Sequence, residues 1–219
     1  MTTFHLIDRK EWAREPYFAH YSETSACAFG MTANLDVTLL LRRLRERKVK
    51  LYPAFLYMTM RSVHIDTAFR TSFDGSGRLG YWERMEPVYT IFHPEDRTFS
   101  AIWTPFENDF ARFHASYEED RERYGGAKGL FTKPNVPANV ISISSIPWTS
   151  FTSFQLQLYN KGDYLLPIVT GVKWFASGER TLLPVSLQVH HAVCDGYHAS
   201  LFLNEMQRLA DTADDWLDG

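Results

Sequence analysis

This chain has few cysteines, little net charge and no long apolar run, and each of these features excludes a class of protein. Only Cys27 and Cys194 occur among the 219 residues, so we expect two free thiols in a reducing cytoplasm and not a disulfide scaffold. A formal net charge of only −3 argues against a nucleic-acid-binding surface. No apolar run approaches the roughly 18 residues of a membrane span, and residues 1–12 lack the apolar segment of a secretory signal. The sequence therefore predicts a cytoplasmic protein that uses neither nucleic acid nor membrane as a partner.

The residues that are present suit one globular unit. Hydrophobic residues make up 45% of the chain and aromatic residues 15%, which is enough for a substantial core. The chain contains no repeat, no low-complexity linker and no break in composition. We therefore expect a single domain over residues 1–219.

Hydrophobic periodicity and turn residues predict a mixture of helices and strands. Helices are expected at 36–44, 53–63, 107–124 and 197–209, and strands at 88–93, 98–104, 139–146, 151–158, 168–175 and 182–189. Asp74 and Gly75 mark a turn between short strands. Because strands and helices do not alternate regularly, the pattern favours an α+β fold, a sheet with helices on one side.

The most informative segment is His190-His191-Ala192-Val193-Cys194-Asp195-Gly196, between the last predicted strand and the last predicted helix. Imidazole accepts and returns a proton near neutral pH, so His191 at this fixed edge is the candidate general base. Each residue also has a structural interpretation: a strand-end histidine, an ordinary N-cap at Asp195, and turn chemistry at Gly196. Those interpretations stay open, but they leave two adjacent histidines unexplained.

This motif, with the segment 183–189 before it, closely resembles the active-site signature of the chloramphenicol acetyltransferase family. The shorter His-His-x-x-x-Asp-Gly pattern also occurs in related acyltransferases and in peptide-synthetase condensation domains. Further matches follow in the same order along nearly the whole chain: Trp12-Ala13-Arg14-Glu15 with Phe18 and Tyr21, Lys50-Leu51-Tyr52-Pro53, Thr90-Ile91-Phe92-His93, Ile143-Ser144-Ser145-Ile146-Pro147-Trp148 and Pro167-Ile168-Val169-Thr170. These favour the narrower family.

The resemblance implies a two-layer sandwich of a mixed, largely antiparallel sheet with helices on one side, of the CoA-dependent acyltransferase type. It also implies a homotrimer with each active site between neighbouring subunits. The implied reaction is acetylation of the 3-hydroxyl of chloramphenicol, with acetyl-CoA as co-substrate and no metal or prosthetic group.

The resemblance also assigns catalytic roles. His191 would take its proton directly from the acceptor hydroxyl, with its other ring nitrogen bonded to its own backbone carbonyl. Ser144 would donate a hydrogen bond to the tetrahedral oxyanion, and Thr170 would hold an ordered water near it. Arg14 and Asp195 would form a buried, supporting ion pair.

Ordinary structural roles remain possible interpretations for some of these residues. Ser142, Ser144 and Ser145 also fit polar positions of a half-exposed strand, and Thr170 fits ordinary β-propensity. A serine hydrolase is disfavoured because the chain has no Gly-x-Ser-x-Gly elbow.

Binding residues are implied in two groups, although each aromatic could equally be ordinary core. The drug pocket would be lined by Tyr21, Cys27, Phe29, Phe99, Phe131, Phe154, Leu156 and Ile168. The coenzyme would be flanked by Lys50, Tyr52, Trp148, Lys173 and Trp174. The chain departs from the family at Trp174 (often tyrosine), Ser142 (usually asparagine) and His20 (usually aromatic), so we expect the fine shape of the site to differ from that of other members.

Two other functions fit parts of the pattern. One is the catalytic domain of a dihydrolipoamide acyltransferase, disfavoured because we expect no lipoyl domain or flexible linker and because the pocket is aromatic. The other is a non-catalytic protein that sequesters the drug, which would need the pocket but not His191.

Overall fold

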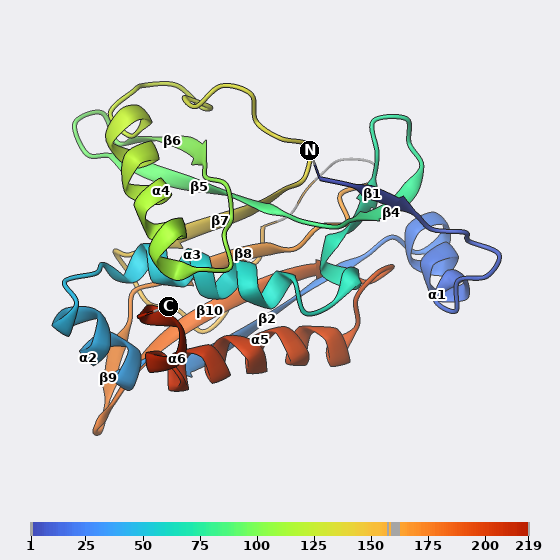
Figure 1. Cartoon of the computed structure of the whole chain (residues 1–219). Helices are drawn as coiled ribbons and strands as arrows, with labels where there is room; N and C mark the ends of the chain where they lie inside the picture. The colour runs from blue at the N-terminus through green and yellow to red at the C-terminus, as the bar shows by residue number, and fades with distance from the viewer. Residues whose placement is uncertain (1, 157, 159–162, 219) are drawn as a thin grey trace.

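The computed structural model describes residues 2–156, 158 and 163–218 of the chain. A seven-stranded sheet forms one layer, and the long helices cover one of its faces (Figure 1). The sheet order is β2-β10-β8-β7-β5-β6, and β9 pairs with part of β10. Strand β7 pairs in parallel with β5 and β8, whereas the other four pairings are antiparallel. The predicted α+β class and the mixed, largely antiparallel sheet are confirmed.

The strands of this sheet are β2 (Ala28–Asp36), β5 (Glu86–His93), β6 (Thr98–Trp103), β7 (Val140–Ile146), β8 (Ile168–Val172), β9 (Phe175–Ser177) and β10 (Arg180–His190). A separate three-stranded sheet, in the order β1-β4-β3, contains β1 (Phe4–Leu6), β3 (Thr71–Phe73) and β4 (Leu79–Trp82). The predicted turn at Asp74 and Gly75 lies between β3 and β4, as expected.

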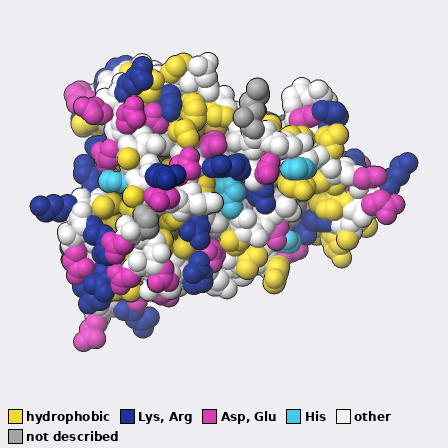
Figure 2. Space-filling view, in the orientation of Figure 1, with side chains coloured by type: hydrophobic (Ala, Val, Ile, Leu, Met, Phe, Trp, Pro, Cys, Tyr) yellow, Lys and Arg dark blue, Asp and Glu magenta, His cyan; other side chains and the backbone are white. Residues whose placement is uncertain are grey.

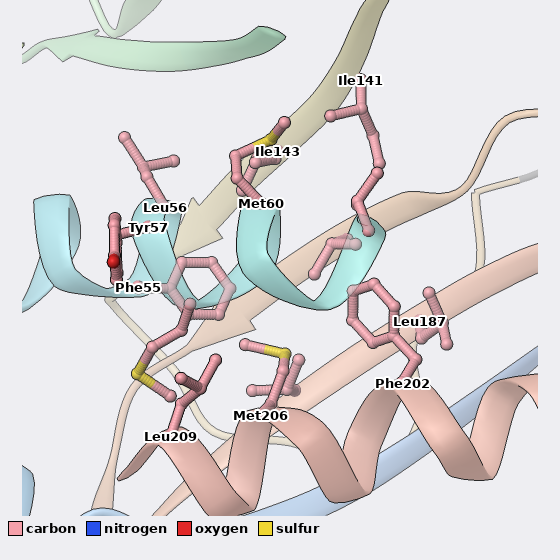
Figure 3. Packing of buried hydrophobic residues seen from close by; sticks show 14 of the residues in the cluster. Phe55, Leu56, Tyr57, Met60, Ile141, Ile143, Leu187, Phe202, Met206 and Leu209 are labelled. Carbon is pink, nitrogen blue, oxygen red and sulfur yellow. The ribbon is translucent and has the colours of Figure 1, made fainter. Parts of the chain in front are cut away.

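The helices are α1 (Glu15–Ala19), α2 (Thr38–Glu46), α3 (Leu51–Val63), α4 (Phe110–Tyr124), α5 (Gly196–Asp211) and α6 (Asp214–Leu217), with a π-helical turn at His20–Thr24 and a 3₁₀ turn at Thr67–Arg70. Helices α3 and α5 pack against each other and against the sheet. Figure 3 shows Phe55 and Met60 of α3, Phe202 and Met206 of α5 and Leu187 of β10 in one apolar cluster. On the helix face, acidic and basic side chains are interspersed (Figure 2).

Alternation along β10 sets up the two faces of the sheet. Val185, Leu187 and Val189 belong to the core beneath the helices, so Ser186 and Gln188 face the other way. The helix face is packed closely, since a Cβ on Gly171 would lie 2.9 Å from the ring of Phe55. Polar side chains on the opposite face are therefore the ones free to contribute chemistry.

Several predicted elements need correction. Helix α4 begins at Phe110, not Glu107, because Asp109 caps it by accepting from the Arg112 amide. The predicted strand 168–175 is two strands, β8 and β9. Among the described residues of 151–158, none is in a strand. Residue 157 lies outside the described residues.

Two predictions from composition can be compared with the structure. Cys27 is exposed, Cys194 is buried, and both are free thiols, as expected. Across the described ranges, none of the helices is long and apolar enough to cross a membrane.

Candidate active site

His191 lies immediately after β10, in the connection to α5. Its ring Nδ1 lies 2.9 Å from the backbone oxygen of Cys194, and its backbone N–H donates to the Cys27 carbonyl at 2.9 Å. A carbonyl oxygen can only accept, so Nδ1 carries the proton and, in the neutral ring, Nε2 is left with a free lone pair. The geometry fixes both the tautomer and the orientation of a base.

The predicted partner of Nδ1 was wrong. The resemblance implied the carbonyl of His191 itself, but that oxygen accepts from Arg14 Nη2 at 3.1 Å. The turn that follows the strand instead brings the Cys194 carbonyl to the ring.

Arg14 holds this turn with all three nitrogens of its guanidinium. Nε donates to the Ala192 carbonyl at 2.9 Å, Nη2 donates to the His191 carbonyl, and Nη1 donates to Asp195 Oδ2 at 3.0 Å. The predicted ion pair is present. It is not buried as expected, however, because the Asp195 side chain is 40% exposed and that of Arg14 17%.

Asp195 has a second partner in His198. Asp195 Oδ1 lies 2.9 Å from His198 Nδ1, and the carboxylate also accepts from the Tyr197 amide to cap α5. Burial alone would raise the pKa of Asp195, but the hydrogen bonds from Arg14 and His198 outweigh it and lower the pKa to about 2. The carboxylate therefore stays charged over the working range of pH.

His190 explains why two histidines are adjacent. The residue is only 7% exposed, and its Nδ1 accepts from the Ala192 amide at 3.2 Å. Burial, followed by the neighbouring His191, lowers the pKa of His190. The neutral ring is thus a structural acceptor within the turn that carries His191.

Three of the predicted pocket residues surround His191. The Tyr21 ring stacks on the imidazole at 4.0 Å between centroids, with an interplanar angle of 22°. Phe29 meets it edge-on at 5.4 Å, and Cys27 contacts its backbone as described above. We call His191 together with Tyr21, Cys27, Phe29, Arg14 and Asp195 the His191 group.

Ser144 and Thr170 are brought together on the sheet face opposite the helices. They pair across β7 and β8, and their hydroxyl oxygens lie 2.9 Å apart. Thr170 is also opposite Ser186 of β10. The pair presents a hydroxyl donor of the kind that an oxyanion requires.

Within a single chain, Ser144 and Thr170 lie far from His191. Ser186 is beside Thr170 in the register, and His191 comes five residues later, just after the end of β10. At about 3.3 Å per strand residue, His191 lies about 16 Å further along the sheet direction. The two sets of catalytic candidates are therefore separated within a single chain.

Three further pocket residues, Phe154, Leu156 and Ile168, lie along this gap, at the level of Ser186 and Gln188. Ile168 is buried on β8, next to Ser142 of β7. Phe154 and Leu156 lie against β10 through hydrogen bonds to Ser186 and Gln188.

Phe99 and Phe131 lie still further from His191. They are 52% and 59% exposed and lie at the β6 edge of the sheet. This edge is four strand spacings, about 19 Å, from β10. The predicted drug pocket is thus not closed within one chain.

Most of the predicted coenzyme residues cluster. Tyr52, Lys173 and Trp174 line a cavity of about 200 Å³ beside the start of α3. Burial raises the pKa of the Tyr52 hydroxyl, which donates to the Thr90 carbonyl at 3.3 Å. Lys50 is exposed just before α3.

Trp148 is 59% exposed and lies edge-on to Phe92, 4.6 Å between centroids. Within the described residues, no cluster of three His, Cys, Asp or Glu side chains could hold a metal ion.

Sequence reasoning missed three side chains that shape the site: His198, Ser186 and Gln188. The i, i+3 spacing of Asp195 and His198 resembles a capping box and could have signalled their contact. Ser186 and Gln188 gave no such signal, because their partners are backbone atoms about 30 residues away.

Comparison with known proteins identifies the family of this chain. The family model described as chloramphenicol acetyltransferase matches residues 2–207. A chloramphenicol acetyltransferase of Clostridium butyricum is 48% identical over 215 residues, 98% of each chain.

Solved structures show the fold. One described as chloramphenicol acetyltransferase covers 95% of this chain and 100% of its own, with a TM-score of 0.82 at 20% identity. A dihydrolipoamide acetyltransferase of Azotobacter vinelandii covers 92% of this chain and 88% of its own, with a TM-score of 0.66 at 16% identity. Because the family model matches residues 2–207 of this chain and a relative is 48% identical to it, the chain belongs to the chloramphenicol acetyltransferase family and is an acyltransferase.

Proposed function

We propose that the chain is one acyltransferase domain that transfers the acetyl group of acetyl-CoA to the 3-hydroxyl of chloramphenicol, which inactivates the drug. One observation carries the proposal. The His191 ring is held through Nδ1 on the Cys194 carbonyl and lies under the aromatic ring of Tyr21, so Nε2 is an oriented, unprotonated base beside an aromatic lining.

In this mechanism, His191 Nε2 accepts the proton of the acceptor hydroxyl as its oxygen attacks the thioester carbonyl. The C–O bond forms and the carbonyl π electrons move to oxygen, giving a tetrahedral oxyanion. Collapse breaks the C–S bond, and the imidazolium returns its proton to the departing CoA thiolate. No acyl-enzyme is formed, and both substrates are bound together before transfer.

Ser144 supplies the hydrogen bond to that oxyanion. Its contact with Thr170 supports the role, since a hydroxyl that has a second hydroxyl as partner can turn its own proton toward a ligand. Thr170 in turn holds a water beside the intermediate. Arg14 and Asp195 act on the turn that carries His191 and do not exchange protons with substrate.

We further propose that each complete site lies between two subunits of a homotrimer. The separation of about 16 Å along the sheet between Ser144 and His191 supports this arrangement. One subunit would supply the His191 group, and its neighbour would supply Ser144, Thr170 and the pocket residues beside them. In a cyclic trimer, the same pairing recurs at every interface.

The coenzyme would lie along Tyr52, Lys173 and Trp174. The cavity that these residues line supports the assignment, with the indole ring offering a stacking surface and the ammonium group a point charge for phosphate. Lys50 and Trp148 would extend the same surface toward solvent.

The direct test is to incubate the purified protein with chloramphenicol and acetyl-CoA and to follow free thiol and loss of the drug together. The proposal predicts stoichiometric thiol release and drug loss, each dependent on the other substrate. Thiol release with dihydrolipoamide but not with chloramphenicol would favour the acyltransferase-domain alternative. Drug binding without any thiol release would identify a sequestering protein instead.

A further inference from the structure

Two polar side chains of β10 hold a separate segment of the chain against the sheet. The segment 151–156 lies on the face opposite the helices, where Ser186 Oγ donates to the Phe154 carbonyl at 2.7 Å. Two residues further along, Gln188 Oε1 accepts from the Leu156 amide at 2.8 Å and Gln188 Nε2 donates to the Leu156 carbonyl at 2.6 Å. We call Ser186 and Gln188 the clasp.

The Gln188 amide behaves as a substitute for a neighbouring strand. It satisfies both the donor and the acceptor of one residue, as a ladder partner would, although the segment forms no strand. A carboxylate of the same size could accept from the Leu156 amide but would set an acceptor against the carbonyl. The contact therefore requires an amide and not merely a polar side chain.

The segment is seated closely on the sheet. Gly30 of β2 pairs with Gln188, and a Cβ on Gly30 would lie 3.0 Å from Cγ of Gln155. Ser186 is 3% exposed, so its hydrogen bond is protected from water. Hydrogen bonds at two alternate residues of one strand, with close packing on the adjacent strand, fix the segment in position.

The clasp also lies beside the proposed oxyanion donor. Ser186 is opposite Thr170, whose hydroxyl contacts Ser144. The clasp thus sets the distance between the backbone that carries Phe154 and Leu156 and the hydroxyl pair on β7 and β8.

We infer that Gln188 and Ser186 are positioning residues for the acceptor, which fix the wall formed by Phe154 and Leu156 without touching the acceptor themselves. This inference rests on the proposed function, in which those two side chains line the drug pocket. The coenzyme cavity lies on the other face, where Phe55, Gly171 and Leu183 line it. Loss of the clasp therefore weakens binding of the acceptor and leaves binding of acetyl-CoA unchanged.

The test compares Gln188→Glu, Gln188→Leu and Ser186→Ala with wild type. Ser186→Ala loses one part-buried hydrogen bond, and the Gln188 variants lose one or both of the hydrogen bonds to Leu156, so we expect KM and Kd for chloramphenicol to rise about tenfold, about 1.4 kcal/mol. The KM for acetyl-CoA should change less than about twofold. Asn34→Asp makes the same amide-to-acid change at an exposed position of β2 and should leave all constants at wild-type values.

Each outcome has a distinct meaning. Unchanged chloramphenicol constants in both Gln188 variants, or an equal rise in the constants for both substrates, would overturn the inference. Kd is measured by calorimetry without acetyl-CoA, so that result does not depend on turnover. If wild type itself neither binds nor acetylates chloramphenicol, the proposed function is wrong. If wild type is active and the clasp variants have the same constants, only the inference about the clasp is wrong.

Discussion

Removing Arg14 should destabilise the protein more than removing Asp195, even though the two form an ion pair. Arg14 makes three hydrogen bonds from a side chain that is 17% exposed, two of them to backbone carbonyls of the catalytic turn. With about 1–1.5 kcal/mol for each bond, Arg14→Ala should cost about 3–4 kcal/mol.

The cost at Asp195 should be smaller. Asp195→Ala loses an N-cap, about 1 kcal/mol, and one half-exposed ion pair, up to about 1 kcal/mol. The expected loss is about 1–2 kcal/mol, below the 3–5 kcal/mol typical of a fully buried pair.

A double-mutant cycle measures the coupling. Urea unfolding of wild type, both single variants and the double variant at one fixed protein concentration should show a double loss about 1 kcal/mol smaller than the sum. Arg14→Lys is the matched control: it keeps the charge, but its single nitrogen cannot reach all of the acceptors that Nε, Nη1 and Nη2 reach, so it should resemble Arg14→Ala. Strict additivity, or a larger loss for Asp195→Ala than for Arg14→Ala, would refute the reasoning.

Four further predictions concern the chemistry and the pH dependence. His191→Ala should abolish nearly all acetyl transfer yet leave chloramphenicol binding by calorimetry largely intact, and substantial turnover by this variant would disprove the general base. Ser144→Ala should lower kcat by roughly 10²–10³ with modest changes in both KM values, whereas a thiol burst and an acetylated Ser144 in wild type given acetyl-CoA alone would indicate a nucleophile. Burial lowers the pKa of His190 in the fold, so its contribution to the free energy of unfolding is complete above its ordinary value of 6.5 and is lost as the pH falls below it, and a pH series of urea titrations should show a shallower loss in His190→Gln. Asp195 acts in the same direction further down, with stability lost between its ordinary value of 3.8 and about 2, and Asp195→Asn should remove that part of the acid transition.

Local pattern was sufficient for much of the fold. Leu40, Leu41 and Leu44 recur at helical spacing and are buried in α2. The hairpin of β5 and β6 turns where the sequence between two alternating runs contains Pro94. These elements are predictable because each depends on neighbours a few residues away.

The segment 151–158 shows where local pattern fails. Its apolar residues resemble a strand, but the backbone partners of Leu156 are the atoms of the Gln188 side chain, so no ladder forms among the residues of this segment that the structure describes. Strand propensity reports how well a side chain fits a sheet and not whether a partner strand is available.

The candidate site likewise contains some residues that local spacing predicts and others that depend on contacts between distant parts of the chain. His191 and Asp195 could be singled out from their spacing, but Arg14 is 177 residues from the carbonyl of His191 and was found only through the family resemblance. The Cys194 carbonyl as the Nδ1 partner depends on the conformation of one turn, which residue types do not specify. In the proposed trimer, Ser144 and His191 would meet only on assembly, which no local pattern in one chain encodes.

The most direct test of the account is subunit complementation between the His191→Ala and Ser144→Ala variants. If each site takes His191 from one subunit and Ser144 from its neighbour, an equal mixture that is unfolded and reassembled contains both intact residues at about one quarter of its interfaces. The account predicts recovery of about one quarter of wild-type activity, with none when His191→Ala is mixed with the double variant. A mixture with no more activity than the average of its two components would show that both residues act within one chain and would contradict the account.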